Sequence, residues 1–149
     1  MKKIERQVYL NKLISYKDKS LIKVITGIRR CGKSTIMESY RDWLKYSGVL
    51  PEQIVYLNFE DYDYYELRDP KKLYDYVRQK IQQDKMTYLF FDEIQQVKDF
   101  PDVINSLNLK PTVDIYITGS NAYMLSSEIA TLLSGRYVEI AMLPLSFRE

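Results

Sequence analysis

Residues 21–35 read LIKVITGIRRCGKST, and this stretch decides the fold. The apolar, largely β-branched run Leu21–Thr26 predicts a short buried strand. Residues 27–35 then match the pattern G-x-x-x-x-G-K-[ST], which is typical of loops that bind phosphate groups. The residues that follow predict a helix from Lys33 to about Tyr46. A strand, a glycine-containing loop and a helix in this order are the context that the pattern requires.

Each part of the loop has a physical task. Gly27 and Gly32 permit backbone angles at which successive N–H groups point at phosphate oxygens. Lys33 brings a positive charge to the β- and γ-phosphates, the Ser34 hydroxyl is a ligand for Mg²⁺, and the helix start adds its partial positive charge. Either arginine of the loop could contact phosphate or cover the loop from outside, and Cys31 is interpreted as a small filler. We therefore predict that ATP and Mg²⁺ bind at Gly27, Arg29, Arg30, Cys31, Gly32, Lys33, Ser34 and Thr35.

A second stretch, Tyr88–Glu93 (YLFFDE), resembles the Walker B element, in which an apolar strand ends in two acids. Asp92 would hold Mg²⁺ through water, and Glu93 would orient the water that attacks the γ-phosphate. Many buried strands end in an acid, so the acid pair indicates a Walker B element only in combination with the phosphate loop. Lys33 and Glu93 are thus candidate catalytic residues, and Ser34 and Asp92 are the candidate metal ligands.

Strands and helices alternate along the chain. The patterns predict five strands and five helices, the strands at 21–26, 54–59, 88–91, 113–118 and 137–142 and the helices at 4–18, 33–46, 70–83, 100–109 and 124–133. This alternation indicates an α/β fold of three layers, with a parallel sheet covered by helices on both faces. Ligands of such sheets bind beyond the carboxyl ends of the strands. The polar segments 27–35, 92–93 and 118–121 each follow a strand, so we expect them to meet at one edge.

Composition and charge narrow the choice of function. The chain has 149 residues, which suits one domain, and its 22 basic and 20 acidic residues give a net charge of +2. This balance predicts neither nucleic-acid binding nor its avoidance. A single cysteine fits a reducing cytosol, and no apolar run approaches the ~18 residues of a membrane span, so we expect a cytoplasmic protein. The absence of histidine excludes histidine-based catalysis and histidine metal sites.

Six segments in order, GIRRCGKST, YLNFED, LFFDEIQ, ITGSNA, SGRY and PLSFRE, carry a resemblance to a known family. The sequence is similar to the AAA-like P-loop ATPase domain of bacterial and archaeal proteins that have a C-terminal domain of uncharacterised function. The resemblance covers the chain from about Lys3 to Glu149. It implies a five-stranded sheet of order 5-1-4-3-2 and Mg²⁺-dependent ATP hydrolysis that drives a conformational switch. It also implies that residues 1–149 form the ATP-binding domain, with a lid and further domains, and any protein or DNA partner that these engage, beyond this chain.

Analogy with AAA-type ATPases adds two further roles, and the position of Arg136 suggests a third. A polar group just after the fourth strand can sense the γ-phosphate, and Ser120 and Asn121 fit equally, although both also favour a helix N-cap. Asn58 could restrain Glu93 or be an ordinary loop residue. Arg136 could supply charge to the transition state or be a solvated arginine. Ser120, Asn121 and Arg136 therefore join the candidate catalytic residues.

Two other classes of protein share the phosphate loop. A small-molecule phosphotransferase would need an acceptor pocket and an arginine-rich lid, and adjacent Asp92 and Glu93 fit water activation better than transfer to an acceptor. A GTPase would need an Asn-Lys-x-Asp element, which the sequence lacks. A nucleotide-gated interaction module, in which ATP binding switches a partner surface and turnover is incidental, remains an alternative. The sequence does not predict the oligomeric state.

Overall fold

The computed structural model describes residues 3–27, 32–119, 131–133 and 135–142. Over these residues the elements follow one another as α1 (Lys3–Ser15), β1 (Ile22–Thr26), α2 (Lys33–Tyr46), β2 (Ile54–Asn58), α3 (Pro70–Arg78), β3 (Thr87–Asp92), α4 (Phe100–Asn108), β4 (Val113–Gly119) and β5 (Tyr137–Ala141). Short 3₁₀ helices join them at η1 (Pro51–Gln53), η2 (Tyr62–Arg68) and η3 (Ile94–Gln96).

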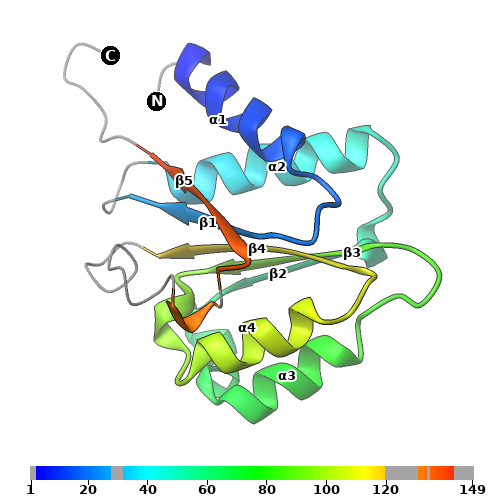
Figure 1. Cartoon of the computed structure of the whole chain (residues 1–149), viewed down its shortest axis with the longest axis vertical. Helices are drawn as coiled ribbons and strands as arrows, with labels where there is room; N and C mark the ends of the chain where they lie inside the picture. Colours follow the sequence, from blue (N-terminus) through cyan, green and yellow to red (C-terminus); the bar gives the residue numbers. More distant parts are fainter. Residues whose placement is uncertain (1–2, 28–31, 120–130, 134, 143–149) are drawn as a thin grey trace.

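The five strands form one parallel sheet of order β2-β3-β4-β1-β5 (Figure 1). Read from the other side, this is the order 5-1-4-3-2 that the family resemblance implies, so the predicted three-layer α/β fold is confirmed. β4 lies between β1 and β3. The strand that leads into the phosphate loop and the strand that ends in two acids are therefore separated by one strand only.

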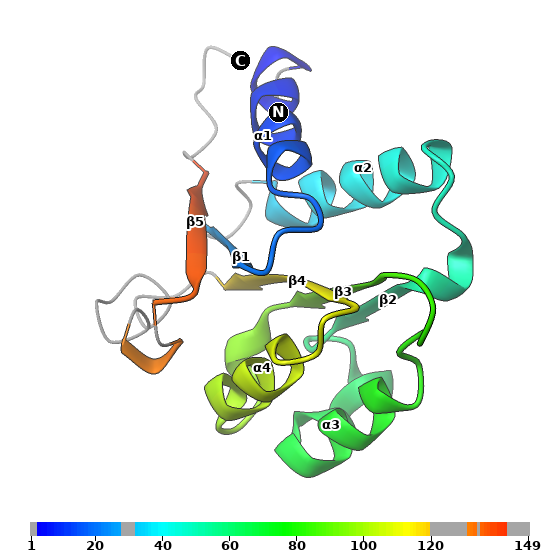
Figure 2. The ribbon, with the colours of Figure 1, turned by 45° about the vertical axis from the view of Figure 1, so that its right-hand side comes forward.

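Helices cover both faces of this sheet, with α1 and α2 on one side and α3 and α4 on the other (Figure 2). Alternate residues of β3 serve the two layers. Leu89 and Phe91 pack with α3 and α4, whereas Tyr88 and Phe90 pack with α1 and α2. Every residue of β1, β3 and β4 is buried. Burial on both faces explains why these strands are nearly continuous apolar runs in the sequence.

Two helices are shorter than predicted, and one prediction cannot be compared. The N-terminal helix ends at Ser15, because the chain turns through Asp18, whose φ of 65° is left-handed. The third helix ends at Arg78, well before residue 83, because the backbone N–H of Gln82 already donates to Thr87 Oγ1 at the start of β3. Of the helix predicted at 124–133, only residues 131–133 lie within the described part.

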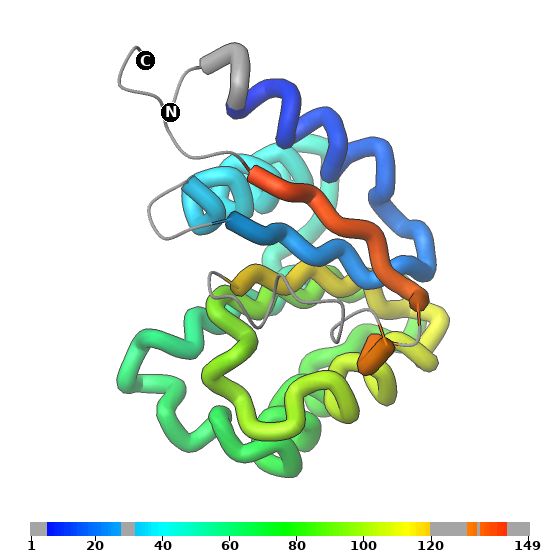
Figure 3. The backbone as a smooth tube through the Cα atoms, turned by 60° about the vertical axis from the view of Figure 1, so that its left-hand side comes forward, coloured from blue at the N-terminus to red at the C-terminus, as the bar shows by residue number. Residues whose placement is uncertain are grey.

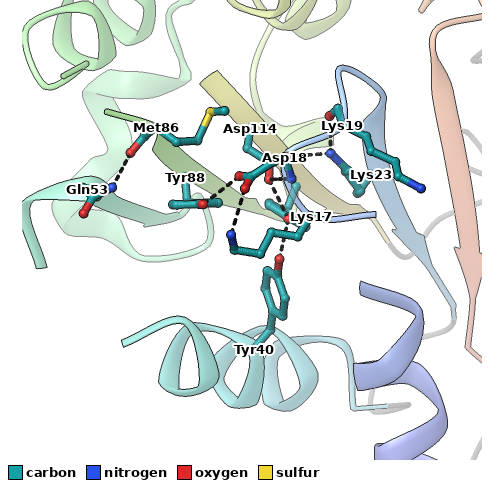
Figure 4. A network of polar contacts seen from close by, with 10 residues as sticks. Lys17, Asp18, Lys19, Lys23, Tyr40, Gln53, Met86, Tyr88 and Asp114 are labelled. Carbon is teal, nitrogen blue, oxygen red and sulfur yellow. Dashed lines mark hydrogen bonds and ion pairs between the residues drawn. The ribbon is translucent and has the colours of Figure 1, made fainter. Parts of the chain in front are cut away.

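A buried ion pair ties β1 to β4 at the amino end of the sheet, far along both strands from the phosphate loop (Figure 4). Lys23 Nζ lies 2.5 Å from Asp114 Oδ1, and neither side chain is exposed. The other carboxylate oxygen accepts hydrogen bonds from Asp18 N and Tyr116 OH, both at 2.9 Å. Burial raises the pKa of the Asp114 carboxyl and lowers the pKa of the Lys23 ammonium, although each partner offsets part of that cost. Removal of either side chain would therefore leave the other charge buried without its partner.

We expect Lys23→Met to lower the free energy of unfolding by about 3–5 kcal/mol, because the Asp114 carboxylate would stay buried without its cation. Lys72→Met is the matched control, since Lys72 is exposed on α3 and a surface change of this kind stays within about 0.5 kcal/mol. Urea unfolding of the two variants and the parent measures the difference. Equal unfolding midpoints for both variants would contradict the role given to the ion pair.

Candidate nucleotide-binding site

The carboxyl ends of the strands form the edge at which the predicted polar segments meet. Thr26, the last residue of β1, lies opposite Gly119 of β4, and Asn58 of β2 lies opposite Asp92 of β3. The segments that follow β1, β3 and β4 therefore leave the sheet on the same side. This is the edge at which parallel α/β sheets bind ligands.

The phosphate loop is described at its two ends. Arg29, Arg30 and Cys31 lie outside the described residues, so their predicted contacts stay predictions. Gly32 has φ 96° and ψ 17°, a left-handed conformation that favours glycine. Lys33 follows it as the first residue of α2, is 6% exposed, and donates from Nζ to the carbonyl oxygen of Gly27 at 2.9 Å. Its ammonium thus reaches back across the loop to the loop's first residue.

The carboxylate of Asp92 is held by three hydroxyl groups. Ser34 Oγ on α2 donates to Oδ2 at 2.6 Å, Tyr56 OH on β2 donates to the same oxygen at 2.8 Å, and Thr118 Oγ1 on β4 donates to Oδ1 at 2.6 Å. Asp92 is only 1% exposed. The structure therefore brings together the two predicted metal ligands, Ser34 and Asp92, in direct contact, while exposed Thr35 lies beside them on the first turn of α2.

Tyr56 is held in the form that donates to Asp92. Burial first, and then the neighbouring Asp92 carboxylate, raise the pKa of the Tyr56 hydroxyl well above its ordinary value. Arg41 of α2 stacks on the Tyr56 ring, with Cζ 3.7 Å from the ring centroid. This cation–π contact fixes the ring between α2 and the sheet. Tyr56 thus remains protonated and keeps its oxygen on Asp92.

Glu93 lies in a strained turn directly after Asp92. Its φ of 58° and ψ of 53° are left-handed, which costs a non-glycine residue about 1–3 kcal/mol. Its backbone N–H donates to Thr118 Oγ1 at 2.9 Å, and its Oε2 accepts from Gln95 Nε2 at 3.3 Å. A single hydroxyl, that of Thr118, accepts from Glu93 N and donates to Asp92. It therefore fixes both acids at once.

Thr118 and Tyr56 were not among the residues that sequence reasoning selected. The signal for Thr118 is a hydroxyl near the end of a buried strand next to the acid strand, whereas the predicted sensor residues lie beyond Gly119. Ser120 and Asn121 lie outside the described residues, so the choice between them stays open. Asn58 Oδ1 accepts from Glu60 N at 3.0 Å, a contact that closes a turn.

Arg136 does not lie at this edge, so the structure does not bring it together with Ser34 and Asp92, and its charge-supplying role stays a prediction. It immediately precedes β5, which runs beside β1 and parallel to it (Figure 3). In the register of these two strands, Tyr137 lies opposite Ile22. Its carbonyl accepts from Ile22 N at 2.9 Å at the start of both strands. The phosphate loop begins after Thr26, roughly 13–16 Å further along the sheet. A parallel strand puts its first residue at the edge opposite the ligand.

Comparison with known proteins agrees with this geometry. Residues 19–149 match the family model described as an AAA domain. The chain belongs to the AAA domain family. This AAA domain is therefore a P-loop NTPase domain of the AAA type, as the resemblance implied. It is 47% identical over 148 residues to an uncharacterized protein of Haemophilus influenzae, covering 98% of this chain and 37% of that protein.

A second relative is the uncharacterized protein MJ1544 of Methanocaldococcus jannaschii, with 35% identity over 128 residues, 86% of this chain and 27% of that protein. The AAA domain thus spans only about a third of the length of the curated relatives it matches. Among solved structures it is similar to the Walker-type ATPase PABY2304 of Pyrococcus abyssi, with a TM-score of 0.66 and 16% identity over 96% of this chain and 54% of that one. It is also similar to AMPPCP-bound DnaA of Aquifex aeolicus, with a TM-score of 0.57 and 13% sequence identity, covering 89% of this chain and 43% of that one. At these identities the likeness concerns the fold.

We expect Thr118→Val to lower the free energy of unfolding by about 1–3 kcal/mol, because Asp92 Oδ1 loses a donor and the buried Glu93 N–H loses its acceptor. Thr118→Ser keeps the hydroxyl and should retain most of the stability. Urea unfolding compares the two variants with the parent chain. If the serine variant were as unstable as the valine variant, packing of the methyl group, and not the hydroxyl, would explain the effect.

Proposed function

We propose that this AAA domain binds ATP together with Mg²⁺ and hydrolyses it to ADP and phosphate. The observation that carries the proposal is the contact of Ser34 Oγ with Asp92 Oδ2 at 2.6 Å, between residues 58 positions apart in the chain. Ser34 belongs to the helix after the phosphate loop, and Asp92 belongs to the acid pair. One contact therefore joins the two predicted motifs.

The residues at this contact suit Mg²⁺. The ion prefers oxygen ligands, keeps several waters, and is usually held by one or two protein groups together with substrate phosphates. Ser34 would be a direct ligand, and Asp92 would hold the ion through water. When bound, the ion would neutralise charge on the β- and γ-phosphate oxygens. Tyr56 and Thr118 orient the Asp92 carboxylate from both of its oxygens.

Lys33 and Glu93 would act on the nucleotide itself. Lys33 already places its ammonium at the mouth of the loop, where its charge would meet the terminal phosphates. Glu93 would accept a hydrogen bond from water and orient it for in-line attack on the γ-phosphorus. Its backbone is fixed by Thr118, so its carboxylate starts from a defined position. The displaced ADP would leave from the loop.

The setting of the domain is also part of the proposal. Turnover would drive a conformational switch in a longer cytoplasmic protein, whose lid and further domains would complete the site and engage a protein or DNA partner. The similar DnaA structure holds AMPPCP, which supports an adenine nucleotide as the ligand. Within the part of the chain that the structure describes, no helix has the length and apolarity needed to span a membrane.

We expect Lys33→Ala to weaken ATP binding by about 10- to 100-fold, because it removes a charge-assisted contact worth roughly 1.5–3 kcal/mol. Calorimetric titration with ATP and Mg²⁺ measures the affinity. Lys45→Ala is the control, since Lys45 is an exposed lysine in the last turn of the same helix. Equal affinity of Lys33→Ala and the control for ATP would contradict the assignment of residues 27–35 as a phosphate-binding loop.

We expect Glu93→Gln to bind ATP with the parent's affinity and to hydrolyse it about 100-fold more slowly or worse, because the amide cannot polarise water as the carboxylate does. Phosphate release by the full-length protein measures turnover, and Glu52→Gln, which changes an exposed carboxylate in η1, is the matched control. Wild-type turnover in Glu93→Gln would place the water-activating group elsewhere, with Asp61 the next carboxylate to replace. Wild-type partner binding by the same variant without turnover would favour the nucleotide-gated module.

A further inference from the structure

The segment after β2 presents aromatic rings to solvent. In η2, Tyr62 is 79% exposed and Tyr65 is 50% exposed, and their rings stack with centroids 5.1 Å apart and planes at 30°. Exposing two large rings side by side leaves apolar area in water that a monomer would ordinarily cover. Tyrosines of this kind are among the residues that dominate the energetics of protein interfaces.

A groove runs beside these rings. It has a volume of about 480 Å³ and is lined by η2 residues 62–67 and by Tyr76 of α3. Its walls therefore carry four tyrosines and one leucine together with Asp63 and Glu66. The groove is open to solvent, in contrast to the enclosed pockets that bury most of a small molecule.

The groove also carries a strong local charge. Residues 60–69 contain five acids and one base, in a chain whose net charge is +2. The single base, Arg68, turns inward and donates from Nε and Nη2 to the carbonyl of Phe59, at 3.1 and 2.8 Å. Its Cζ lies 5.1 Å from the Tyr65 ring centroid, which shows that a guanidinium can stack on this ring. Acidic side chains beside exposed rings favour a cationic ligand and repel phosphate backbones.

The groove is held in place from both sides. The N–H of Phe59, just before η2, donates to the carbonyl of Asp92 at 3.0 Å, and the N–H of Lys98 donates to the carbonyl of Arg68 at 3.1 Å. Asp61 caps the start of η2 by accepting from Asp63 N at 2.9 Å. A surface fixed in this way loses little conformational freedom on binding, which raises affinity. The Phe59 bond connects this segment to the strand that carries Asp92.

We infer that this tyrosine groove, residues 62–67 with Tyr76, is a docking site for an arginine- or lysine-bearing segment of a partner protein. Cationic side chains would stack on Tyr62 and Tyr65 and pair with Asp63 and Glu66, while apolar side chains would enter the groove. The inference needs neither ATP binding nor hydrolysis. It assigns a protein, and not a nucleic acid, to this face of the domain.

The test is selection of peptides from a random 12-residue library by the full-length protein, followed by anisotropy titration of the most enriched labelled peptide. We expect arginine and lysine to be enriched over the library, and Tyr62→Ala/Tyr65→Ala to weaken binding about tenfold or more. Asp63→Asn/Glu66→Gln should weaken binding and reduce its salt dependence. Tyr46→Ala is the matched control, because Tyr46 is a 92% exposed tyrosine at the end of α2, and it should bind as the parent does.

Four results would overturn the inference. These are no enrichment of basic residues, unchanged affinity in Tyr62→Ala/Tyr65→Ala, tighter binding of a 20-nucleotide single-stranded DNA that the same double variant abolishes, and self-association of the parent chain that this variant abolishes. The last two would assign the groove to nucleic acid or to a second copy. All the substituted side chains are on the surface, so circular dichroism should confirm that each variant is folded.

Discussion

The buried carboxylate of Asp92 accepts hydrogen bonds from hydroxyl groups on α2, β2 and β4, and the arrangement of the site depends on these contacts. Burying a carboxylate costs free energy unless its oxygens accept hydrogen bonds, so the loss of any one of these donors would destabilise the folded state. The order of the strands allows these three contacts, because β2 and β4 are the neighbours of β3. The helix α2 follows β1, which is the next strand after β4 in the sheet. Ligands that enter would meet a carboxylate already oriented.

The two edges of the sheet carry different polar contacts. At the amino edge, Lys23 and Asp114 form a buried ion pair that joins β1 to β4. Asp114 also accepts a hydrogen bond from the backbone N–H of Asp18, in the turn after α1. At the carboxyl edge, the same two strands lead to the phosphate loop and to Thr118. Rigid strands between the edges keep Thr118 in register with the loop. The strained turn at Glu93 is tolerated because its backbone is bonded to β4.

The acid strand also supports the surface of η2. Phe59 donates to the Asp92 carbonyl, and Arg68 accepts from Lys98, so the segment that contains η2 is bonded to the chain at Asp92 and again at Lys98, beyond Glu93. The candidate nucleotide site and the exposed tyrosine groove are thus joined through the same stretch of backbone. Binding at one place can influence the other only if it shifts that shared backbone, and any such effect must be reciprocal.

The sequence by itself determined the alternation of strands and helices, the phosphate loop and the acid pair, because these are carried by local periodicity and by short motifs with fixed spacing. The family resemblance added the strand order, which no local pattern contains. Only the tertiary structure decided that Tyr56 and Thr118 hold Asp92, since a hydroxyl within a strand looks the same whichever neighbour it faces. It also placed Arg136 at the opposite edge from the phosphate loop, because the direction of a strand within a sheet decides which edge its first residue occupies. Local patterns specify elements, and long-range pairing specifies which side chains meet.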